Sequence, residues 1–532
     1  MATQTVTELQ TFESYVAASS RKSHESPAEA SPTTITLNNT ANEAATATLS
    51  KTRTTIVIVQ LLGVSLFSSF CNGVIVVGLP AMAATLQLQE GLLVWPTSVF
   101  YLTAGSCLLI AGSIADVVGP KRVNLVGSLL GAAFALGCGL AQTGGELIAF
   151  RALQGVSNAI IVPSSISIIS TSMEDGRPRN IGFGCLGFSA PVGFSLGLVL
   201  GGVFVDSTGW RPAFYLAGAA GFALFLIGIW ALPRDARPPA GTSVWKRLAL
   251  DIDWVGAILA STGLATLSYV FATLSADIHN IRRASNIVLL VICAASVLTF
   301  VWWMHYQVKH NRTALIPNSL WRSAVFTSSC IMVLFATAVT NCMELFSSLF
   351  FQEVQGNSAL GASLRILPSL IAGALTNLST GIFVNRMPVM WTVLISSGAS
   401  AIAPLLMALV QPEWPYWYDA FFAQIFAPLS CDILFTIGLL VISDVFPKHM
   451  QALSGAVFNT CAQLGTAVGL TITSVIAASV TDASNYDEKS SPGAILVGYR
   501  AVFWTMFAWM LLVCVVCVLG LRRIGEVGVK RD

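Results

Sequence analysis

The chain has 532 residues, of which 55% are hydrophobic and 10% are charged, and its formal net charge is +2. A mean hydropathy of +0.73 exceeds what a soluble core of this length would need, so the composition indicates a polytopic membrane protein. The basic residues are dispersed among loops instead of forming one patch, which argues against nucleic acid as a partner. The eleven cysteines fall inside apolar runs at no metal-like or disulfide-like spacing, so we expect packing residues, no metal and no cofactor.

Residues 1–50 are rich in Thr, Ser, Ala and Glu and contain no apolar run, which predicts a disordered tail. No basic start leads into an apolar stretch with a small-residue cleavage site, so the first span itself is expected to direct insertion.

Fourteen apolar stretches are each long enough to cross a bilayer as a helix, for which about 20 residues suffice. This predicts an all-α membrane protein with two six-helix bundles and two helices between them. The spans are 55–83, 93–115, 123–142, 146–171, 180–205, 211–232, 252–274, 285–306, 323–351, 361–384, 388–410, 418–443, 451–480 and 499–521. The expected parts are a tail, 1–50; a first bundle, 51–232; a linker with two extra spans, 233–320; a second bundle, 321–521; and a cytoplasmic tail, 522–532.

Basic residues are distributed unevenly between the two sides that this topology creates. The tail, the C-terminus and every second loop together hold 21 of the 28 Lys and Arg, whereas the other loops hold five. The positive-inside rule therefore predicts both termini in the cytoplasm. The glycosylation sequons at Asn38 and Asn311 would then face the cytoplasm and stay unmodified.

The turn between spans two and three carries charges that helix dipoles do not explain. Asp116 ends one helix, and Lys121 and Arg122 begin the next, so each opposes the local dipole. Topology accounts for the basic pair but leaves Asp116 in need of a partner. A fainter copy, Gly381 to Asn385 followed by Arg386, ends span ten and hints at an internal repeat.

Span four places Arg151, Gln154, Gly155 and Asn158 on one helical face. A guanidinium inside a span is costly and normally faces a cavity or a partner. The alternative is that Arg151 extends to the nearby membrane surface. Span five carries a ladder of small residues that lets a neighbouring helix approach closely, formed by Gly193, Gly197, Gly201 and Gly202.

These motifs resemble the major facilitator superfamily, and more narrowly its fourteen-span drug:proton antiporter branch of fungal type. The family's loop pattern Gly-x-x-x-Asp-Arg-x-Gly-Arg-Arg/Lys matches at Gly112, Asp116, Gly119, Lys121 and Arg122, with Val117 and Pro120 in basic positions. The resemblance implies that this loop latches the two bundles on the cytoplasmic side, with Asn385 and Arg386 as an unequal second latch. A plain positive-inside turn is the alternative.

The same resemblance assigns roles to spans four and five. The Arg-x-x-Gln-Gly pattern of the family implies that Arg151 lies in a central cavity and takes part in proton coupling. The glycine ladder fits the antiporter signature, but Leu198 replaces its proline, which weakens the inference to export. In span one, Cys71 stands where the branch carries an acid, so a span-one carboxylate is not available to move protons.

A proton carrier must exchange its proton near ambient pH, and burial of a carboxyl group favours its neutral form. Asp432, near the middle of span twelve, is our main candidate, and Glu344, in the outer half of span nine, is a helper. The alternative is that hydrogen bonds or pairing with Arg151 or Arg365 merely neutralise these acids.

The substrate is expected between the bundles at mid-membrane, where amides and aromatic side chains suit uncharged or weakly amphipathic organic molecules. Packing or lipid contact is the alternative for each aromatic side chain. The candidate lining residues are Asn72, Trp95, Gln154, Asn158, Asn341, Phe346, Phe350, Asn377, Asn459 and Gln463.

The sequence therefore predicts a proton-coupled exporter of toxicants, drugs or a secondary metabolite, which binds a small molecule, protons and lipid. Transport of a small inorganic solute such as ammonium or borate is the alternative, and a sensor that moves nothing is a remote one. We find no nucleotide-binding loop and no catalytic constellation, so we expect neither an ATPase nor another enzyme. A monomer in the plasma membrane is expected, with the vacuolar membrane as the alternative.

Overall fold

A computed structural model divides the chain into residues 1–48 and 49–532, and only the second unit is described here. The expected N-terminal tail, both sequons, Asn385 and Arg386 lie outside the described residues, as does the C-terminal tail beyond Arg522. The structure describes residues 51–88, 92–173, 177–235, 252–276, 281–310, 312, 315–316, 320–383, 388–446 and 448–522.

Within these ranges the regular structure is helical. The helices of the first half are α3 (Lys51–Leu86), α4 (Trp95–Val118), α5 (Pro120–Leu140), α6 (Gly144–Ser172), α7 (Arg177–Ser207), α8 (Arg211–Ala231), α10 (Trp254–Ala276) and α11 (Ala284–Lys309). Those of the second half are η5 (Leu320–Arg322), α12 (Ala324–Leu349), η6 (Phe350–Val354), α13 (Ala359–Phe383), α14 (Val389–Leu409), α15 (Ala420–Phe426), α16 (Leu429–Val445), α17 (Lys448–Asp482) and α18 (Pro492–Leu521).

Thirteen helical segments of the described chain are long and apolar enough to cross a membrane, and α10 adds a shorter apolar stretch, Trp254–Leu267. Each predicted span coincides with a helical segment, which confirms the fourteen-helix fold. Span twelve differs from the expectation because it is broken into α15 and α16 around Pro428. Proline lacks the N–H that would continue the helical ladder, so α16 begins immediately after it.

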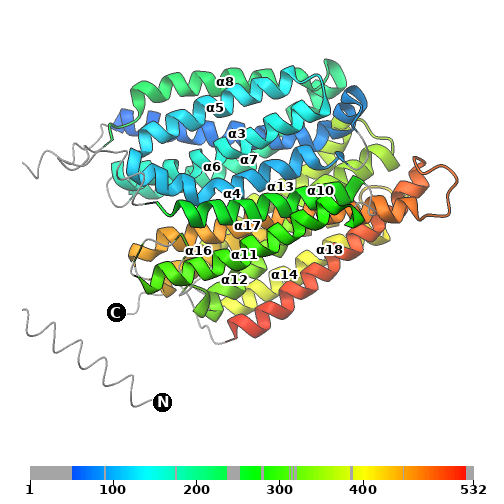
Figure 1. Cartoon of the computed structure of the whole chain (residues 1–532). Coiled ribbons are helices and arrows are strands. Elements are labelled where there is room, and N and C mark those ends of the chain that lie inside the picture. Colours follow the sequence, from blue (N-terminus) through cyan, green and yellow to red (C-terminus); the bar gives the residue numbers. More distant parts are fainter. Residues whose placement is uncertain are drawn as a thin grey trace, which may run out of the picture. The chain divides into compact units, whose positions relative to one another are not determined.

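The helices form two bundles with one pair between them (Figure 1). In the first bundle α3 packs on α7 and α8, while α6 packs on α4 and α5. In the second bundle α12 packs on α17 and α18, and α14 on α18. The bundles meet where α4 lies against α17 and α7 against α13, and α10 contacts both α4 and α17. We call the side where α3 begins and α18 ends the proximal face, and the side where α7 ends and α13 begins the distal face.

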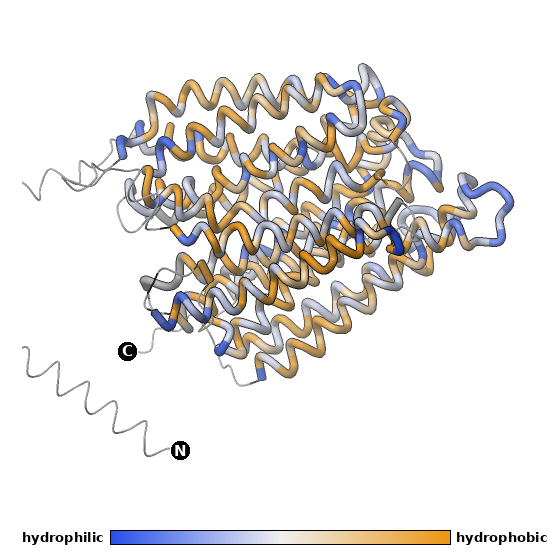
Figure 2. Tube along the Cα trace, in the orientation of Figure 1, coloured by the Kyte–Doolittle hydropathy of each residue, from blue (hydrophilic) through white to orange (hydrophobic). Residues whose placement is uncertain are grey.

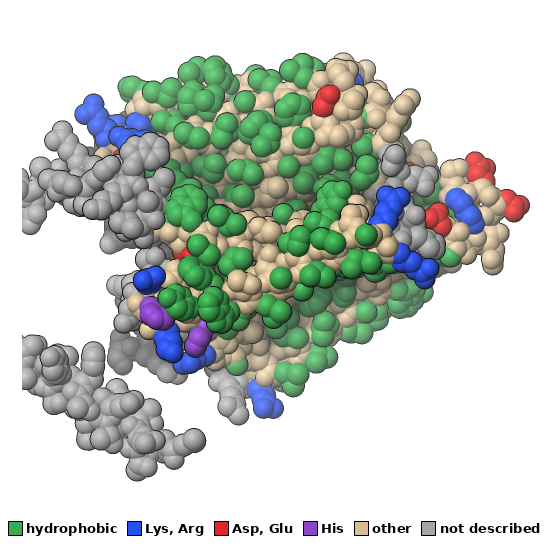
Figure 3. Space-filling model, viewed as in Figure 1, with side chains coloured by type: hydrophobic (Ala, Val, Ile, Leu, Met, Phe, Trp, Pro, Cys, Tyr) green, Lys and Arg blue, Asp and Glu red, His purple; other side chains and the backbone are tan. Residues whose placement is uncertain are grey.

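Apolar residues run along the helices, whereas hydrophilic residues gather near their ends (Figure 2). The space-filling view shows hydrophobic side chains over the middle of the visible helices, with Lys and Arg towards both ends (Figure 3). Large apolar side chains such as Leu298 and Trp230 are about 70% exposed, which suits contact with lipid tails.

The glycine ladder of α7 lies against two different helices. A Cβ atom added to Gly197 would come within 2.1 Å of the Phe70 carbonyl oxygen on α3, so only glycine allows this approach. Gly202 faces the other bundle, where an added Cβ would lie 2.8 Å from the Leu360 Cα on α13. Gly193 and Gly201 lie against α3 in the same way as Gly197.

Candidate functional site

Arg151 on α6 is completely buried within the first bundle. Its Nε donates to the Pro96 carbonyl oxygen at 2.9 Å, its Nη1 donates to Gln154 Oε1 at 2.7 Å, and its Nη2 donates to Asn72 Oδ1. The guanidinium also lies 4.5 Å from the centre of the Phe100 ring. It therefore points inward and does not extend to the membrane surface. These hydrogen-bond partners are all neutral, so none of them compensates its charge.

The two candidate acids belong to the second bundle and lie near each other. Glu344 is half-buried on α12, and Asp432 occupies the first turn of α16 because the helix restarts after Pro428. The two carboxyl groups lie within electrostatic range of each other. Asp432 Oδ2 lies 2.6 Å from the position that a Cβ on Gly373 would occupy, so the carboxyl group rests against the backbone of α13.

Tyr101 on α4 connects these groups across the bundle boundary. It lies within electrostatic range of both Arg151 on its own bundle and Glu344 on the other. Arg151, Tyr101, Glu344 and Asp432 are thus linked by pairwise electrostatic interactions across the bundle boundary, which the sequence predicted only in part. A hydroxyl-bearing aromatic residue inside an apolar span is the signal by which Tyr101 could have been found.

The other residues expected to line the cavity lie in different environments. Asn341 donates to Thr466 Oγ1 on α17 at 3.2 Å. Asn377 accepts from Thr436 Oγ1 at 3.3 Å. Phe346 and Phe350 are buried in the second bundle, and Phe346 packs edge-on against a tyrosine, Tyr499. Trp95 has a buried indole N–H without a partner among the residues that the structure describes. Asn459 is half-buried on α17, and Gln463 lies where α17 meets Gly105 of α4.

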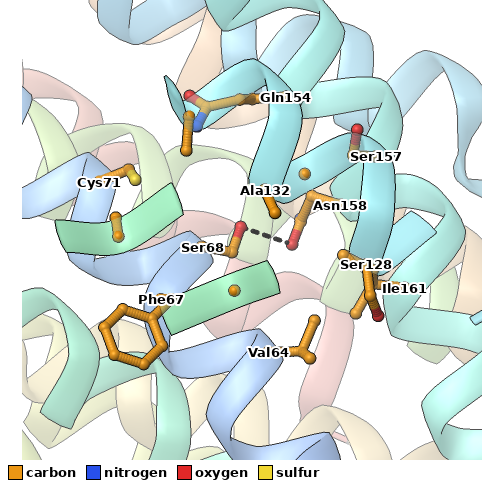
Figure 4. A pocket seen from close by; sticks show the side chains of 14 residues that line it. Val64, Phe67, Ser68, Cys71, Ser128, Ala132, Gln154, Ser157, Asn158 and Ile161 are labelled. Carbon is orange, nitrogen blue, oxygen red and sulfur yellow. Dashed lines mark hydrogen bonds between the residues drawn. The ribbon is translucent and has the colours of Figure 1, made fainter. Parts of the chain in front are cut away.

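A pocket lies inside the first bundle, between α3, α5, α6 and α8 (Figure 4). Gln154 and Asn158 line it together with Ser68, whose hydroxyl donates to Asn158 Oδ1 at 3.1 Å. This pocket lies within the first bundle, whereas the substrate site was expected between the two bundles.

The charged turn between α4 and α5 has partners that the sequence did not reveal. The Asp235 carboxylate accepts from the backbone N–H groups of Lys121 at 2.8 Å and Arg122 at 3.3 Å, and so caps the start of α5. Lys121 Nζ donates to the carbonyl oxygens of Ile229 at 3.0 Å and Leu232 at 2.7 Å, at the negative end of α8. Both interactions offset the unfavourable placement of Lys121 and Arg122 at the positive N-terminal end of the α5 dipole.

Asp116 differs from Lys121 in this turn. It is exposed on the last turns of α4, and it forms no hydrogen bond or ion pair with any other residue that the structure describes. Gly119, three residues after Asp116, has a φ of +110°, a conformation that glycine adopts without strain. Gly112, about one turn before Asp116, packs near Pro163. The proposed contact of Asp116 with the second bundle therefore remains a prediction.

The two bundles are hydrogen-bonded to each other at the distal face. The Asp206 carboxylate on α7 accepts from the backbone N–H groups of Ala359 at 3.1 Å and Leu360 at 3.0 Å. Nearby, Ser363 Oγ donates to the Leu198 carbonyl oxygen at 2.8 Å. From α12 and η6, Ser348 and Gln352 donate to backbone carbonyl oxygens of α3 at 3.2 and 3.1 Å. This end of the interface is closed in the structure.

Asp419 lies directly before α15 and just outside the apolar segment Ala420–Ile442, although the expected span began at residue 418. It is 6% exposed, and neither carboxylate oxygen has a hydrogen-bond partner within the described residues. Burial raises the pKa of the Asp419 carboxyl above its ordinary value, although nearby backbone N–H groups act in the opposite direction.

Comparison with known proteins gives a consistent result. The family model described as "Major Facilitator Superfamily" matches residues 61–470 and 369–531. "MFS-type transporter 1" of Pyricularia oryzae is 39% identical over 94% of this chain and 89% of its own length. "Low affinity ammonium transporter" of Saccharomyces cerevisiae is 26% identical over 74% of this chain and 75% of its own length. "Methylenomycin A resistance protein" of Bacillus subtilis is 29% identical over 80% of this chain and 88% of its own length.

A solved structure also has the same fold. It is a bacterial homologue of the human lysosomal transporter Spinster, with a TM-score of 0.61 and 15% identity, covering 89% of this chain and 98% of that one.

Proposed function

Because this chain belongs to the major facilitator superfamily and is a multi-pass membrane transporter of small molecules, we propose that it exports organic compounds in exchange for protons. In this proposal the two bundles rock about a central site that opens alternately to the proximal and distal faces. The closed distal face, with its hydrogen bonds between α7 and α13, corresponds to one of the two states.

One observation supports the proton coupling: ionisable side chains of the two bundles interact electrostatically with one another across the interface. Arg151 supplies a buried positive charge on one side, and Glu344 and Asp432 supply carboxyl groups on the other. Tyr101 interacts electrostatically with both Arg151 and Glu344. A proton that binds to either acid changes the attraction between the bundles, so protonation and bundle movement become linked free energies.

The substrate class is supported by the family relatives and by the residues at the interface. A relative named for methylenomycin A resistance supports export of toxic organic molecules, which include drugs and secondary metabolites. The amides Asn341 and Asn377 and the phenol of Tyr101 offer neutral hydrogen-bonding groups near the ionisable side chains. The relative named as an ammonium transporter favours the alternative of a small inorganic solute.

Purified protein in vesicles tests the proposal. We would impose a pH gradient, add candidate toxicants or methylammonium in separate experiments, and follow internal pH and solute content. We expect organic solutes to move against their gradient and protons to move in the opposite direction. Equal flux after collapse of the pH gradient would contradict proton coupling, and flux of methylammonium alone would favour the alternative.

Variants locate the coupling groups. We expect Asp432→Asn to abolish gradient-driven accumulation and Glu344→Gln to reduce it, while both retain passive exchange of substrate. Asp482→Asn removes an exposed acid at the distal end of α17 and serves as the matched control. Full proton-driven transport by Asp432→Asn would show that another group carries the proton.

The proposed setting is the plasma membrane, with the vacuolar membrane as the alternative, a monomeric protein and both termini in the cytoplasm. The excess of Lys and Arg on the proximal side supports this orientation. Protease protection of terminal tags in sealed cells, together with fluorescence microscopy, tests both points.

A further inference from the structure

The pocket inside the first bundle contains more hydrogen-bonding capacity than its own residues use. Gln154 Oε1 accepts from Arg151 Nη1, and Asn158 Oδ1 accepts from Ser68 Oγ. The amide nitrogen of Asn158 donates to no acceptor among the described residues, whereas the Gln154 side chain also contacts the thiols of Cys138 and Cys71. Asn158, one helical turn from Gln154 on α6, therefore presents an unused donor beside the pocket, and Figure 4 shows the positions of both side chains.

A second group of buried polar side chains continues from the pocket towards the proximal face. Gln60 on α3 is completely buried, and neither its amide nitrogen nor its oxygen has a partner within the described chain. Asn124 on α5 is also completely buried; its nitrogen donates to Ser164 at 3.1 Å and Ser165 at 3.0 Å, but its oxygen has no partner.

These side chains are in register with the pocket. Gln60 precedes the pocket residue Val64 by four positions on α3, and Asn124 precedes Ser128 by four positions on α5. Residues four positions apart lie on the same helical face. Gln60 and Asn124 therefore lie one helical turn from the pocket, on the faces of α3 and α5 that line it, and we call this series of polar groups from Gln60 to Gln154 the path.

We propose that this path is an internal water site, in which bound water molecules join Gln60 and Asn124 to the Gln154–Arg151 pair. Burial of an unpaired amide is unfavourable, and proteins usually avoid this cost by enclosing water that makes about two to four hydrogen bonds. The neutral hydroxyl and amide lining suits water, because each of these groups can donate or accept.

The water site gives the first bundle a proton route that needs no span-one carboxylate. Cys71 lines the pocket at the position where the related pattern carries an acid. In this route the water molecules themselves relay the proton, and the hydroxyl and amide groups hold them in place without titrating. This second part rests on the proposed proton-coupled function, whereas the presence of water does not.

X-ray radiolytic footprinting of the full chain in nanodiscs tests the inference, because hydroxyl radicals form from bound water and react rapidly with cysteine. Cys71 lines the pocket. Cys342 in the second bundle is also buried, and its thiol shares a hydrogen bond with the Thr473 hydroxyl. We expect Cys71 to be modified at least fivefold faster than Cys342. Equal rates for the two thiols would overturn the water site.

Variants connect this signal to the pocket. We expect Asn158→Leu, or the milder Ser68→Val, to lower the modification rate of Cys71 several-fold by filling or drying the pocket. Asn341→Leu is the matched control, since it removes a polar side chain from the second bundle and should leave Cys71 unchanged. Undiminished modification in both folded pocket variants would overturn the proposal.

The outcomes also separate this inference from the proposed function. Rapid modification of Cys71 together with transport that ignores the pH gradient would support the water site and overturn its role as a proton route. Slow modification of Cys71 together with proton-driven transport would overturn the water site and leave the proposed function standing.

Discussion

The Asp206 carboxylate on α7 accepts a hydrogen bond from the backbone N–H of Leu360 at the start of α13, across the boundary between the two bundles, at 3.0 Å. It accepts a second from Ala359 at 3.1 Å, so an acid of one bundle caps a helix of the other. Rocking of the bundles has to break this cap. Asp206 is thus placed where it can set the relative free energies of the closed and open distal face.

We expect Asp206→Asn to open the distal face more often, because the amide accepts fewer hydrogen bonds and lacks the charge that favours a helix N-terminus. A loss of about 1 kcal/mol corresponds to roughly a fivefold change in the ratio of the two states. Electron–electron distance measurements between labels at Thr208 and Ser490 would report it. Glu146→Gln is the control, since Glu146 accepts from Gln142 within one bundle. An unchanged distance distribution would contradict the gating role.

Asp235→Ala should lower the stability of the first bundle. The substitution removes both acceptors that cap α5, at a cost of about 0.5–2 kcal/mol. Thermal unfolding in detergent would measure the change. Asp482→Asn again provides a comparison, and a melting temperature equal to that of the native protein would show that the cap contributes little.

Asp116→Ala should impair transport without lowering stability. We expect transport several-fold lower and an unchanged amount of inserted protein. The side chain is exposed and forms no hydrogen bond within the described residues, so its removal costs this state little. Its function would lie in the state that the structure does not show. Quantitative blotting of membranes together with vesicle flux would test this, and loss of the folded protein would identify a structural role.

Gly373→Ala should displace the Asp432 carboxyl group from α13. An added methyl group would lie 2.6 Å from Asp432 Oδ2, so the acid must rotate away. We expect normal folding and proton-driven accumulation several-fold below that of the native protein. Gly398→Ala is the matched control, because no atom lies within 4 Å of its added methyl group. Equal reductions in the two variants would indicate a general effect of glycine replacement.

Asp419→Asn should stabilise the protein in a pH-dependent manner. Because burial raises the pKa of Asp419, the folded state holds this proton more tightly than the unfolded chain. Stability therefore falls as the pH rises from the unfolded value through the folded one. The variant avoids this fall, so its melting temperature should exceed that of the native protein at pH 7.5 and match it near pH 4. A constant difference across this range would contradict the assignment.

The fold followed from the sequence because long apolar runs admit few structures other than membrane helices. The face shared by Arg151, Gln154 and Asn158 was likewise predictable from helical spacing. Contacts between residues far apart in the chain could not be predicted in this way. Asp235 is 114 positions from Lys121 and Asp206 is 154 positions from Leu360, so no local pattern links them. Tyr101 was overlooked because an aromatic residue in a span is usually a packing residue.

The contact between Asp235 and the α4–α5 turn also affects how the chain connects the first bundle to α10 and α11. Asp235 follows α8 and precedes the segment that leads to α10, which itself touches both bundles. Its carboxylate joins the segment that follows α8 to the start of α5 through two hydrogen bonds. The connection from the first bundle towards α10 is therefore anchored to α5 up to Asp235, so movement of α10 relative to the first bundle cannot displace residues 233–235 unless this cap breaks.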